Sequence, residues 1–234
     1  MKTTFQDKAS LVNSVFSKVY KKYDLMNDIM SIGIHRIWKH KLIDWMNPQK
    51  NETLIDVASG TGDVAKIFSK KNQNTGKISC VEPNNEMYNI GKNNLINLKN
   101  IKWHKAPAEK LPFKNNTFDF YTISYGIRNV SNINVSLAEA LRVLKPGGRF
   151  MCLEFSKIEN EIIKLLYQQY SKTIPIIGKY VVGSSQPYDY LIKSINEFYS
   201  QEELVSLMKN NGFHNIKYRN LSNGISAIHS GWKI

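Results

Sequence analysis

Short apolar runs alternate with longer segments whose apolar residues recur every three or four positions, from residue 53 to residue 156. The short runs favour β-strands, and the longer periodic segments favour α-helices. Such alternation predicts a mostly parallel sheet with helices on both of its faces. Strands are expected at 53–59, 77–83, 100–108, 118–126 and 149–156, and helices at 63–71, 84–98 and 134–144.

The N-terminal part and one internal stretch follow the helical pattern without strands. Apolar residues three and four apart predict helices at the N-terminus, and residues 1–50 are expected to form a helical lid. A helical insertion is expected over 158–199, in which Pro175 and Gly178 are predicted to break the helix. The whole chain, 1–234, is interpreted as one domain.

The C-terminal region predicts an antiparallel end to the sheet. A helix over 200–212, with Ser200 as its N-cap, precedes two β-prone runs. Those runs flank Asn223-Gly224, a dipeptide typical of hairpin turns. We therefore expect the last two strands of the sheet to pair as a hairpin.

Composition narrows the class of protein. A chain of 234 residues suits one α/β domain with elaborations. The two cysteines, Cys80 and Cys152, lie inside apolar runs without a CxxC pattern, which predicts buried free thiols rather than a disulfide or zinc site. His35 and His40 are five residues apart, off the i, i+4 face, so no metal site is expected. Neither a signal peptide nor a membrane span is recognised, and a cytoplasmic protein is expected.

The formal net charge of +13 has three interpretations. It can reflect a compositional bias toward lysine, an affinity for an anionic membrane surface, or an affinity for nucleic acid. The lysines are scattered along the chain rather than gathered in runs of five or six. Nucleic acid is therefore the least favoured partner, and charge alone leaves the other two interpretations open.

The stretch DVASGTGD, residues 56–63, carries the first chemical signal. Glycines at a strand-to-helix turn allow a tight bend and let a ligand approach the backbone closely. Glu82 lies 20 residues after Gly62, at the tip of the next expected strand, where a carboxylate can accept both hydroxyls of a ribose. The pattern predicts an adenosine-type cofactor, either NAD or S-adenosylmethionine.

Two features favour S-adenosylmethionine. A sheet that ends in a hairpin is typical of the methyltransferase variant of the doubly wound fold. Asp63 follows the second glycine directly. An acid at that helix N-terminus repels a pyrophosphate but attracts the ammonium of an amino acid, so NAD is disfavoured there.

Six stretches resemble the ubiquinone/menaquinone-biosynthesis C-methyltransferases, over nearly the whole chain. The glycine loop and LKPGG are shared by many methyltransferases, whereas KYDLMNDIMSIGIHRIWK and YGIRNV are more specific to this family. The stretches are 22–39, 56–63, 111–130, 144–150, 153–157 and 220–233. The resemblance implies a class I S-adenosylmethionine-dependent methyltransferase fold, α/β, with a doubly wound, mostly parallel seven-stranded sheet.

The resemblance also implies a set of cofactor-binding residues. Three of them depart from the family pattern: Ser59 replaces glycine, Glu82 replaces aspartate, and Pro107 replaces an acid or asparagine that reaches the adenine amine. Proline cannot make that contact, so it is expected to be lost or moved. The implied set is Asp56, Ser59, Gly60, Thr61, Gly62, Asp63, Glu82, Pro107, Ala108 and Ser124.

The implied reaction is methylation of a ring carbon of a prenylated benzoquinol or naphthoquinol. Arg128 is expected to favour the phenolate form, whose ortho carbon is the better nucleophile, and Asn129 to hold the second ring oxygen. Each residue can instead have a purely structural role. Arg128 can form an ion pair at the surface, and Asn129 can serve only to turn the loop. From the N-terminal helices, Tyr23 is expected in a catalytic role, as lid or proton relay, or as a packed aromatic.

Further expectations concern the substrate and partners. Asn27, His35 and Tyr125 are expected to contact the substrate, although His35 can also serve only as a cap or in packing. An RNA methyltransferase, or one acting on another small molecule, is the alternative function. The apolar face of 161–182, with its lysines, is expected either to contact an anionic membrane on its inner surface or to pack in the core of the protein. A homodimer or other quinone-biosynthesis enzymes are further candidate partners.

Overall fold

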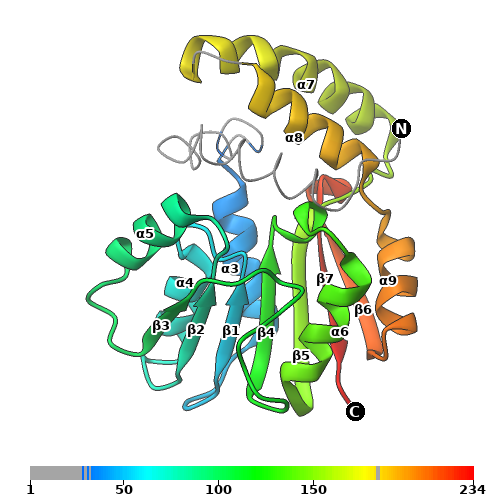
Figure 1. The fold of residues 1–234 in the computed structure, drawn as a ribbon. Coiled ribbons are helices and arrows are strands. Elements are labelled where there is room, and N and C mark those ends of the chain that lie inside the picture. Colours follow the sequence, from blue (N-terminus) through cyan, green and yellow to red (C-terminus); the bar gives the residue numbers. More distant parts are fainter. Residues whose placement is uncertain (1–27, 29–30, 32, 183–184) are drawn as a thin grey trace.

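The computed structural model describes residues 28, 31, 33–182 and 185–234. Within that part, one seven-stranded sheet has the strand order β3-β2-β1-β4-β5-β7-β6 (Figure 1). The first five strands in this order, β3, β2, β1, β4 and β5, run parallel to one another. Strand β7 runs antiparallel to both β5 and β6. The strands are β1 (Leu54–Val57), β2 (Ile78–Val81), β3 (Ile101–His104), β4 (Phe118–Ser124), β5 (Leu144–Phe155), β6 (His214–Leu221) and β7 (Ser226–Trp232).

Helices cover both faces of the sheet because successive strand residues point to opposite sides. Leu54 packs in a core with α3 and α4, whereas its neighbour Ile55 packs in a second core with α6 and α9. Short 3-10 segments, η2 (Ile127–Asn129) and η3 (Ser222–Gly224), follow β4 and β6. The helices are α3 (His35–Met46), α4 (Asp63–Lys71), α5 (Asn85–Asn94), α6 (Ile133–Val143), α7 (Glu161–Val182), α8 (Gln186–Glu197) and α9 (Gln201–Asn210).

The predicted order of strands and helices and the terminal hairpin are confirmed. Asn84 caps α5 by accepting from the Met87 N–H, and Ser200 caps α9 in a capping box. Leu221 pairs with Ser226, so four residues connect β6 to β7 around the expected Asn-Gly turn. Three boundaries differ by four residues or more, since β3 ends at His104, α5 ends at Asn94, and β5 begins at Leu144, before the Pro-Gly-Gly stretch.

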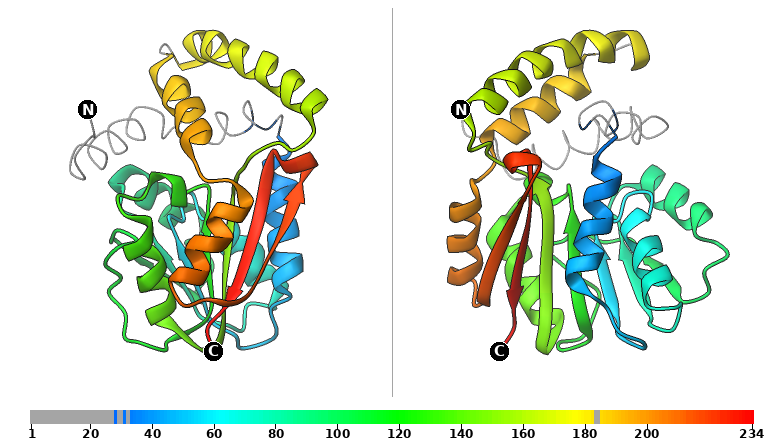
Figure 2. Two further views of the ribbon diagram at one scale, coloured as in Figure 1. Left: turned by 90° about the vertical axis from the view of Figure 1, so that its right-hand side faces the viewer. Right: turned by 180° about the vertical axis from the view of Figure 1, so that it is seen from behind.

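The predicted break in the helical insertion is wrong. Helix α7 is continuous from Glu161 to Val182, with Pro175 inside it and Gly178 in the same run. Proline removes one N–H from the helix ladder, but its fixed φ is itself helical, so the remaining turns can continue. Together α7 and α8 lie across the carboxyl-terminal end of the parallel strands (Figures 1 and 2).

Helix α3 is the longest described part of the expected N-terminal lid, and it belongs to the core. Trp38, Leu42, Ile43 and Met46 are buried on one side of it. These residues pack in the same cluster as α4 and the β1 strand. The apolar stripe of α3 therefore supports the sheet from one face.

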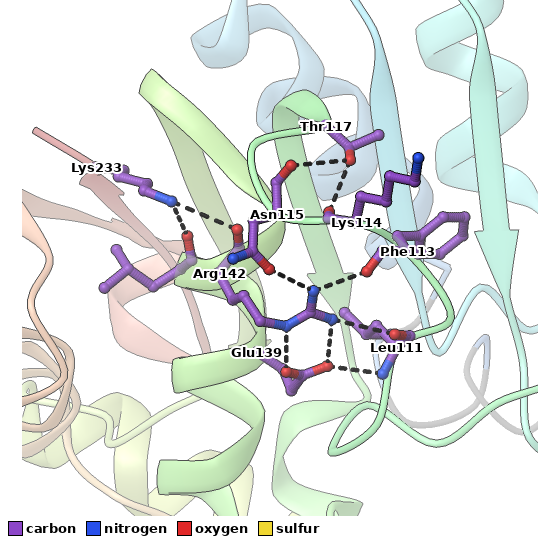
Figure 3. Close-up of polar contacts among 9 residues, drawn as sticks. Leu111, Phe113, Lys114, Asn115, Thr117, Glu139, Arg142 and Lys233 are labelled. Carbon is purple, nitrogen blue, oxygen red and sulfur yellow. Dashed lines mark hydrogen bonds and ion pairs between the residues drawn. The ribbon is translucent and has the colours of Figure 1, made fainter.

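The long connection from β3 to β4 is held by α6 (Figure 3). Arg142 donates to the carbonyl oxygens of Leu111 and Phe113, at 3.1 and 2.7 Å. Its guanidinium also pairs with Glu139, which in turn accepts the Leu111 N–H. Five donors in a planar fork suit this task. The loop that carries Pro107 and Ala108 is thereby anchored at its far end.

Arg149 connects α3 to the antiparallel side of the sheet. Its guanidinium carbon lies 5.1 Å from the ring centroid of Trp45 and 5.0 Å from that of Trp232. The same group donates to Ser230 Oγ at 2.7 Å and to the Trp45 carbonyl oxygen at 3.0 Å. One buried cation therefore joins β5, β7 and the C-terminal end of α3.

We expect Arg149→Met to lower the free energy of unfolding by about 1–3 kcal/mol, because it removes these hydrogen bonds and both cation–π contacts. Urea denaturation followed by tryptophan fluorescence measures the change. Lys209→Met, at an exposed position of α9, is the control and should change the free energy by less than about 0.5 kcal/mol. Equal midpoints for the two variants would contradict the role assigned to Arg149.

Candidate active site

A cavity lies where the strand order reverses, between β1 and β4. In open parallel sheets, ligands bind at the carboxyl ends of the strands at such a switch point. The cavity is lined by the residues that follow β1, by those that end and follow β4, and by the facing side of α3 and α4. These are Lys39, Asp56, Ala58, Ser59, Gly60, Thr61, Asp63, Val64, Ser124 and Tyr125.

The backbone is unusually bent at this point. Gly60 and Gly62 have φ values of 55° and 89°, which glycine adopts without strain. Ala58 and Tyr125 also have positive φ, 52° and 56°, although neither is glycine. A Cβ on Gly126 would lie only 2.5 Å from the Ala58 Cβ, so the loops after β1 and β4 are in close contact. Strained residues of this kind cluster at functional sites.

Two buried carboxylates stand at the ends of β1 and β2. Asp56 accepts the Thr122 hydroxyl at 2.7 Å. Each oxygen of Glu82 accepts one backbone N–H, from Gly60 and from Asn84, both at 2.9 Å. Burial raises the pKa of Asp56 and of Glu82 to about 7. Both groups are therefore poised to change protonation near neutral pH.

Two buried polar atoms near this cavity have no hydrogen-bond partner among the described residues. They are Asp56 Oδ2 and Ser124 Oγ. Asp56 is 1% exposed, so its second oxygen cannot rely on bulk water. Buried polar groups are nearly always paired in native proteins. The cavity walls thus fit a ligand with polar groups of its own, as S-adenosylmethionine has.

Lys39 was not predicted from the sequence, yet it lines this cavity. Its Nζ lies 2.7 Å from Asp63 Oδ2. Burial acts to raise the pKa of Asp63, but the Lys39 ammonium outweighs it and holds that pKa below its ordinary value. In this structure, which holds no ligand, Asp63 is therefore paired with Lys39. A lysine within the apolar stripe of α3 was the available signal.

Arg128 is buried in an ion pair, which excludes the interpretation as a surface arginine. Its Nη1 lies 2.5 Å from Glu154 Oε1 and 2.8 Å from the Tyr125 carbonyl oxygen. Burial raises the pKa of Glu154, and the guanidinium partly offsets that rise. Glu154 is a second residue that sequence reasoning missed. An acid inside the apolar run FMCLEF indicates a buried partner of opposite charge.

A second cavity, of about 430 Å³, lies between η2 and α8. Arg128 and Tyr190 line it together with Ile127, Val130 and Phe198. Next to it, the Tyr190 hydroxyl donates to Asn129 Oδ1 at 3.0 Å. The turn after β4 therefore has two sides, with Ser124 and Tyr125 at the first cavity and Arg128 at the second.

The remaining predicted residues are dispersed. The Tyr125 ring packs against Phe155, with 5.0 Å between centroids. His35 is buried, and its Nε2 lies 2.8 Å from Asp28 Oδ1, outside the residues that line the described cavities. Pro107 is exposed, and its neighbour Ala108 is buried in the core beside β4. Tyr23 and Asn27 lie outside the described residues.

The described residues contain neither a metal-binding cluster nor a membrane-spanning helix. No group of three or more His, Cys, Asp or Glu side chains there is arranged to hold a metal ion. No helix in the described part of the chain combines the length and the apolar character needed to cross a membrane.

Two solved structures share the fold of this chain. A SAM-dependent methyltransferase from Aquifex aeolicus matches with a TM-score of 0.63 at 20% identity, over 84% of this chain and 89% of the other. A SAM-dependent methyltransferase from Thermotoga maritima, described as a possible histamine N-methyltransferase, matches with a TM-score of 0.68 at 22% identity. This match covers 94% of this chain and 99% of the other. Both matches have the fold predicted from the sequence, so the predicted fold is confirmed.

The family follows from closer relatives. The model of the ubiE/COQ5 methyltransferase family matches residues 2–233. A protein of Rickettsia bellii named ubiquinone/menaquinone biosynthesis C-methyltransferase is 49% identical, over 97% of this chain and 94% of its own. A protein of the same name from Brucella suis is 44% identical, over 97% of this chain and 87% of its own. The chain belongs to the ubiE/COQ5 methyltransferase family, which confirms the resemblance and the enzyme class inferred from the sequence.

Gly62 generates a prediction that separates steric overlap from backbone strain. A Cβ at Gly62 would lie 2.6 Å from Leu95 Cδ1 and 3.2 Å from Trp103 Cζ2, whereas one at Gly60 would approach Met87 Cε to 3.4 Å. Both positions have positive φ. We expect Gly62→Ala to lower the free energy of unfolding by about 2–4 kcal/mol.

Gly60→Ala is the matched control and should cost about 1–2 kcal/mol, the strain alone. Urea denaturation of both variants without ligand measures the difference. A Gly62→Ala variant as stable as Gly60→Ala would show that Leu95 and Trp103 move aside at little cost.

Proposed function

We propose that this protein transfers the methyl group of S-adenosylmethionine to a ring carbon of a prenylated benzoquinol or naphthoquinol, a step of ubiquinone or menaquinone biosynthesis. The names of the family's curated members support this substrate class. The observation that carries the proposal is the buried pair of Arg128 and Glu154, held beside the cofactor cavity by the Tyr125 carbonyl.

The proposed cofactor contacts use the free capacity of the cavity walls. S-adenosylmethionine, when bound, supplies an electrophilic methyl group. A carboxylate has about four lone-pair sites, and Glu82 uses one site on each oxygen for a backbone N–H. Its remaining sites can accept the two ribose hydroxyls. Gly60 and Thr61 lie at the cavity with Asp56 and Ser124, and Ala108 offers its backbone to the adenine.

Arg128 acts on the ring oxygen in this proposal. A ring carbon ortho to a phenolate attacks a methyl group more readily than one ortho to a phenol. A guanidinium beside the oxygen favours the ionised form. Because Glu154 neutralises Arg128, the effect on the pKa of the phenol is smaller than that of an isolated cation. The main contribution is then a fixed donor that positions the ring, and positioning can supply up to roughly 7–11 kcal/mol.

The second cavity suits the rest of the substrate. Ile127, Val130 and Phe198 form an apolar wall near Arg128, and such a wall fits a prenyl chain. The Tyr190 hydroxyl donates a hydrogen bond to the amide oxygen of Asn129. The side-chain amide N–H groups of Asn129 can then donate to the second ring oxygen. Tyr125 borders the cofactor cavity, where it can contact the ring.

The test is a methyl-transfer assay with isotopically labelled S-adenosylmethionine and a demethylated prenyl hydroquinone of each ring type. Mass spectrometry with fragmentation locates the label. We expect label on a ring carbon of the benzoquinol, the naphthoquinol or both. Label on an oxygen, or label found only in added RNA, would overturn the proposal in favour of another methyltransferase activity.

The role of Arg128 makes a separate prediction. Removing Arg128 alone leaves Glu154 buried without its partner, which commonly costs about 3–5 kcal/mol. We therefore use Arg128→Met together with Glu154→Leu. We expect this double variant to fold and to bind S-adenosylhomocysteine within about twofold of the wild type. Its turnover should fall at least a hundredfold, most strongly at low pH, where phenolate is scarce.

Calorimetric titration and the methyl-transfer assay measure these two quantities. The control is Arg219→Met, which removes an exposed arginine that lines neither of these two cavities. Normal turnover by the double variant, or a loss of cofactor affinity in proportion to turnover, would make the pair structural rather than catalytic.

We further propose that α7 docks on an anionic membrane, from which a lipid-soluble quinol can be taken. Ile162, Leu165 and Leu166 are 72%, 58% and 65% exposed, while Tyr167 and Tyr170 turn inward. Lys164, the one lysine of the predicted surface whose side chain is described, pairs with Glu161 at 3.1 Å. The apolar residues therefore supply most of the attraction, and the lysine supplies less than the sequence suggested.

We expect sedimentation with vesicles of acidic phospholipid at low salt, and loss of binding for Ile162→Ser, Leu165→Ser and Leu166→Ser combined. Exchange of the exposed Ile96 for Ser is the control. Protein that stays in the supernatant with acidic lipid present would contradict the membrane proposal. Analytical ultracentrifugation of the same variants would then test whether α7 instead pairs two copies of the chain.

A further inference from the structure

The ion pair of Lys39 and Asp63 forms a wall between two spaces. On one side is the cofactor cavity at the glycine loop. On the other side is a wide groove of about 690 Å³ between α3, α4 and the end of α5. Both residues line both spaces. Three further cations, Arg36, Lys66 and Lys70, line the groove together with apolar and amide side chains.

The lysine of this pair is buried, whereas the aspartate is partly exposed to solvent. The Lys39 side chain is 10% exposed and that of Asp63 is 41% exposed. Lys39 also faces Asp56, whose Oδ2 has no partner among the described residues. One ammonium therefore stands between two carboxylates. A buried constellation with an excess of acceptors suits a ligand that brings a further positive group.

The chemistry of the cofactor matches this constellation. S-adenosylmethionine ends in an amino acid, which carries one carboxylate and one ammonium. The Lys39 ammonium can only donate hydrogen bonds, and the ionised Asp63 carboxylate can only accept them. Asp63 also begins α4, where the helix N-terminus favours a second negative group nearby.

We propose that Lys39 and Asp63 together receive the amino-acid end of S-adenosylmethionine, Lys39 binding its carboxylate and Asp63 its ammonium. The proposal rests on this cofactor and adds Lys39 to its binding residues. Without a ligand, the two side chains form an ion pair with each other. The cavity beside them, about 20 Å³, holds roughly one water molecule. Binding therefore exchanges one internal ion pair for two ion pairs to the ligand.

Lys39 is suited to that exchange by its side chain. Four flexible carbons carry a compact ammonium, so the charge can shift while α3 stays in place. The neighbouring Arg36 is engaged with Asp28 at 2.9 Å and lines the groove but not the cofactor cavity. Among the described cations that border the groove, Lys39 alone also borders the cofactor cavity.

The experiment compares ligands that differ in the groups at this end, and each ligand is compared between the wild type and a variant, so the extra sulfonium charge of one ligand cancels. S-adenosylhomocysteine has the complete amino acid, decarboxylated S-adenosylmethionine lacks the carboxylate, and 5′-methylthioadenosine lacks both groups. Isothermal titration measures the dissociation constant of each for the wild type and for Lys39→Met, Lys39→Arg, Asp63→Asn and Lys66→Met. Thermal unfolding without ligand verifies that each variant is folded.

We expect Lys39→Met to bind S-adenosylhomocysteine roughly 10- to 100-fold more weakly, the effect of one charge-assisted hydrogen bond. The same variant should bind the two ligands without a carboxylate within about threefold of the wild type. Lys39→Arg should restore most of the affinity. Asp63→Asn should weaken both ligands that carry an ammonium and spare 5′-methylthioadenosine. Lys66→Met, which changes a cation of the groove alone, should bind all three ligands normally.

Two outcomes would overturn the proposal. Equal losses for all three ligands in Lys39→Met would make the pair a structural clamp between α3 and α4. Unchanged affinity for S-adenosylhomocysteine in that variant would place the carboxylate elsewhere. Failure of the cofactor assignment itself would look different, because the wild type would then bind none of the adenosine ligands.

Discussion

The Arg128 guanidinium and the Glu154 carboxylate are both almost fully removed from water, with side chains 2% and 1% exposed. Neither charge is tolerable there alone, because an unpaired ion in the interior costs several kcal/mol. The pair joins the turn after β4 to the end of β5, and through the Tyr125 carbonyl it fixes the strained residue between the two cavities. Anything that binds at the switch point meets walls whose positions depend on this contact.

Helix α3 is the second element on which the site depends. Its apolar stripe lies in the core, and its C-terminal end is attached to β5 and β7 through Arg149. Lys39 projects from the same stripe toward Asp63. Packing and charge are therefore combined in one helix, so a change in how α3 sits on the sheet would alter the entrance of the cofactor cavity. Residues in the core thus influence ligand binding without touching a ligand.

The sequence was sufficient for the parts of the structure that local rules determine. Alternating apolar runs located the strands, Gly60 and Gly62 located the switch-point loop, and Ser200 located the start of α9. Glu154 and Lys39 were missed because their meaning comes from partners 26 and 24 residues away, which no periodicity reveals. The break expected at Pro175 failed for the opposite reason, since a local rule was outweighed by the turns on either side.

The position of Glu82 links the binding of S-adenosylmethionine to the proton balance of the solution. Its carboxyl has a pKa of about 7 because it is buried, although two backbone N–H groups already favour the ionised form. If the ribose hydroxyls bind there as proposed, they add two more donors to the ionised form and lower that pKa further. Near neutral pH, each binding event then releases a fraction of a proton to the buffer. The heat of binding consequently varies with the ionisation enthalpy of the buffer, and affinity increases as the pH rises toward and past neutrality.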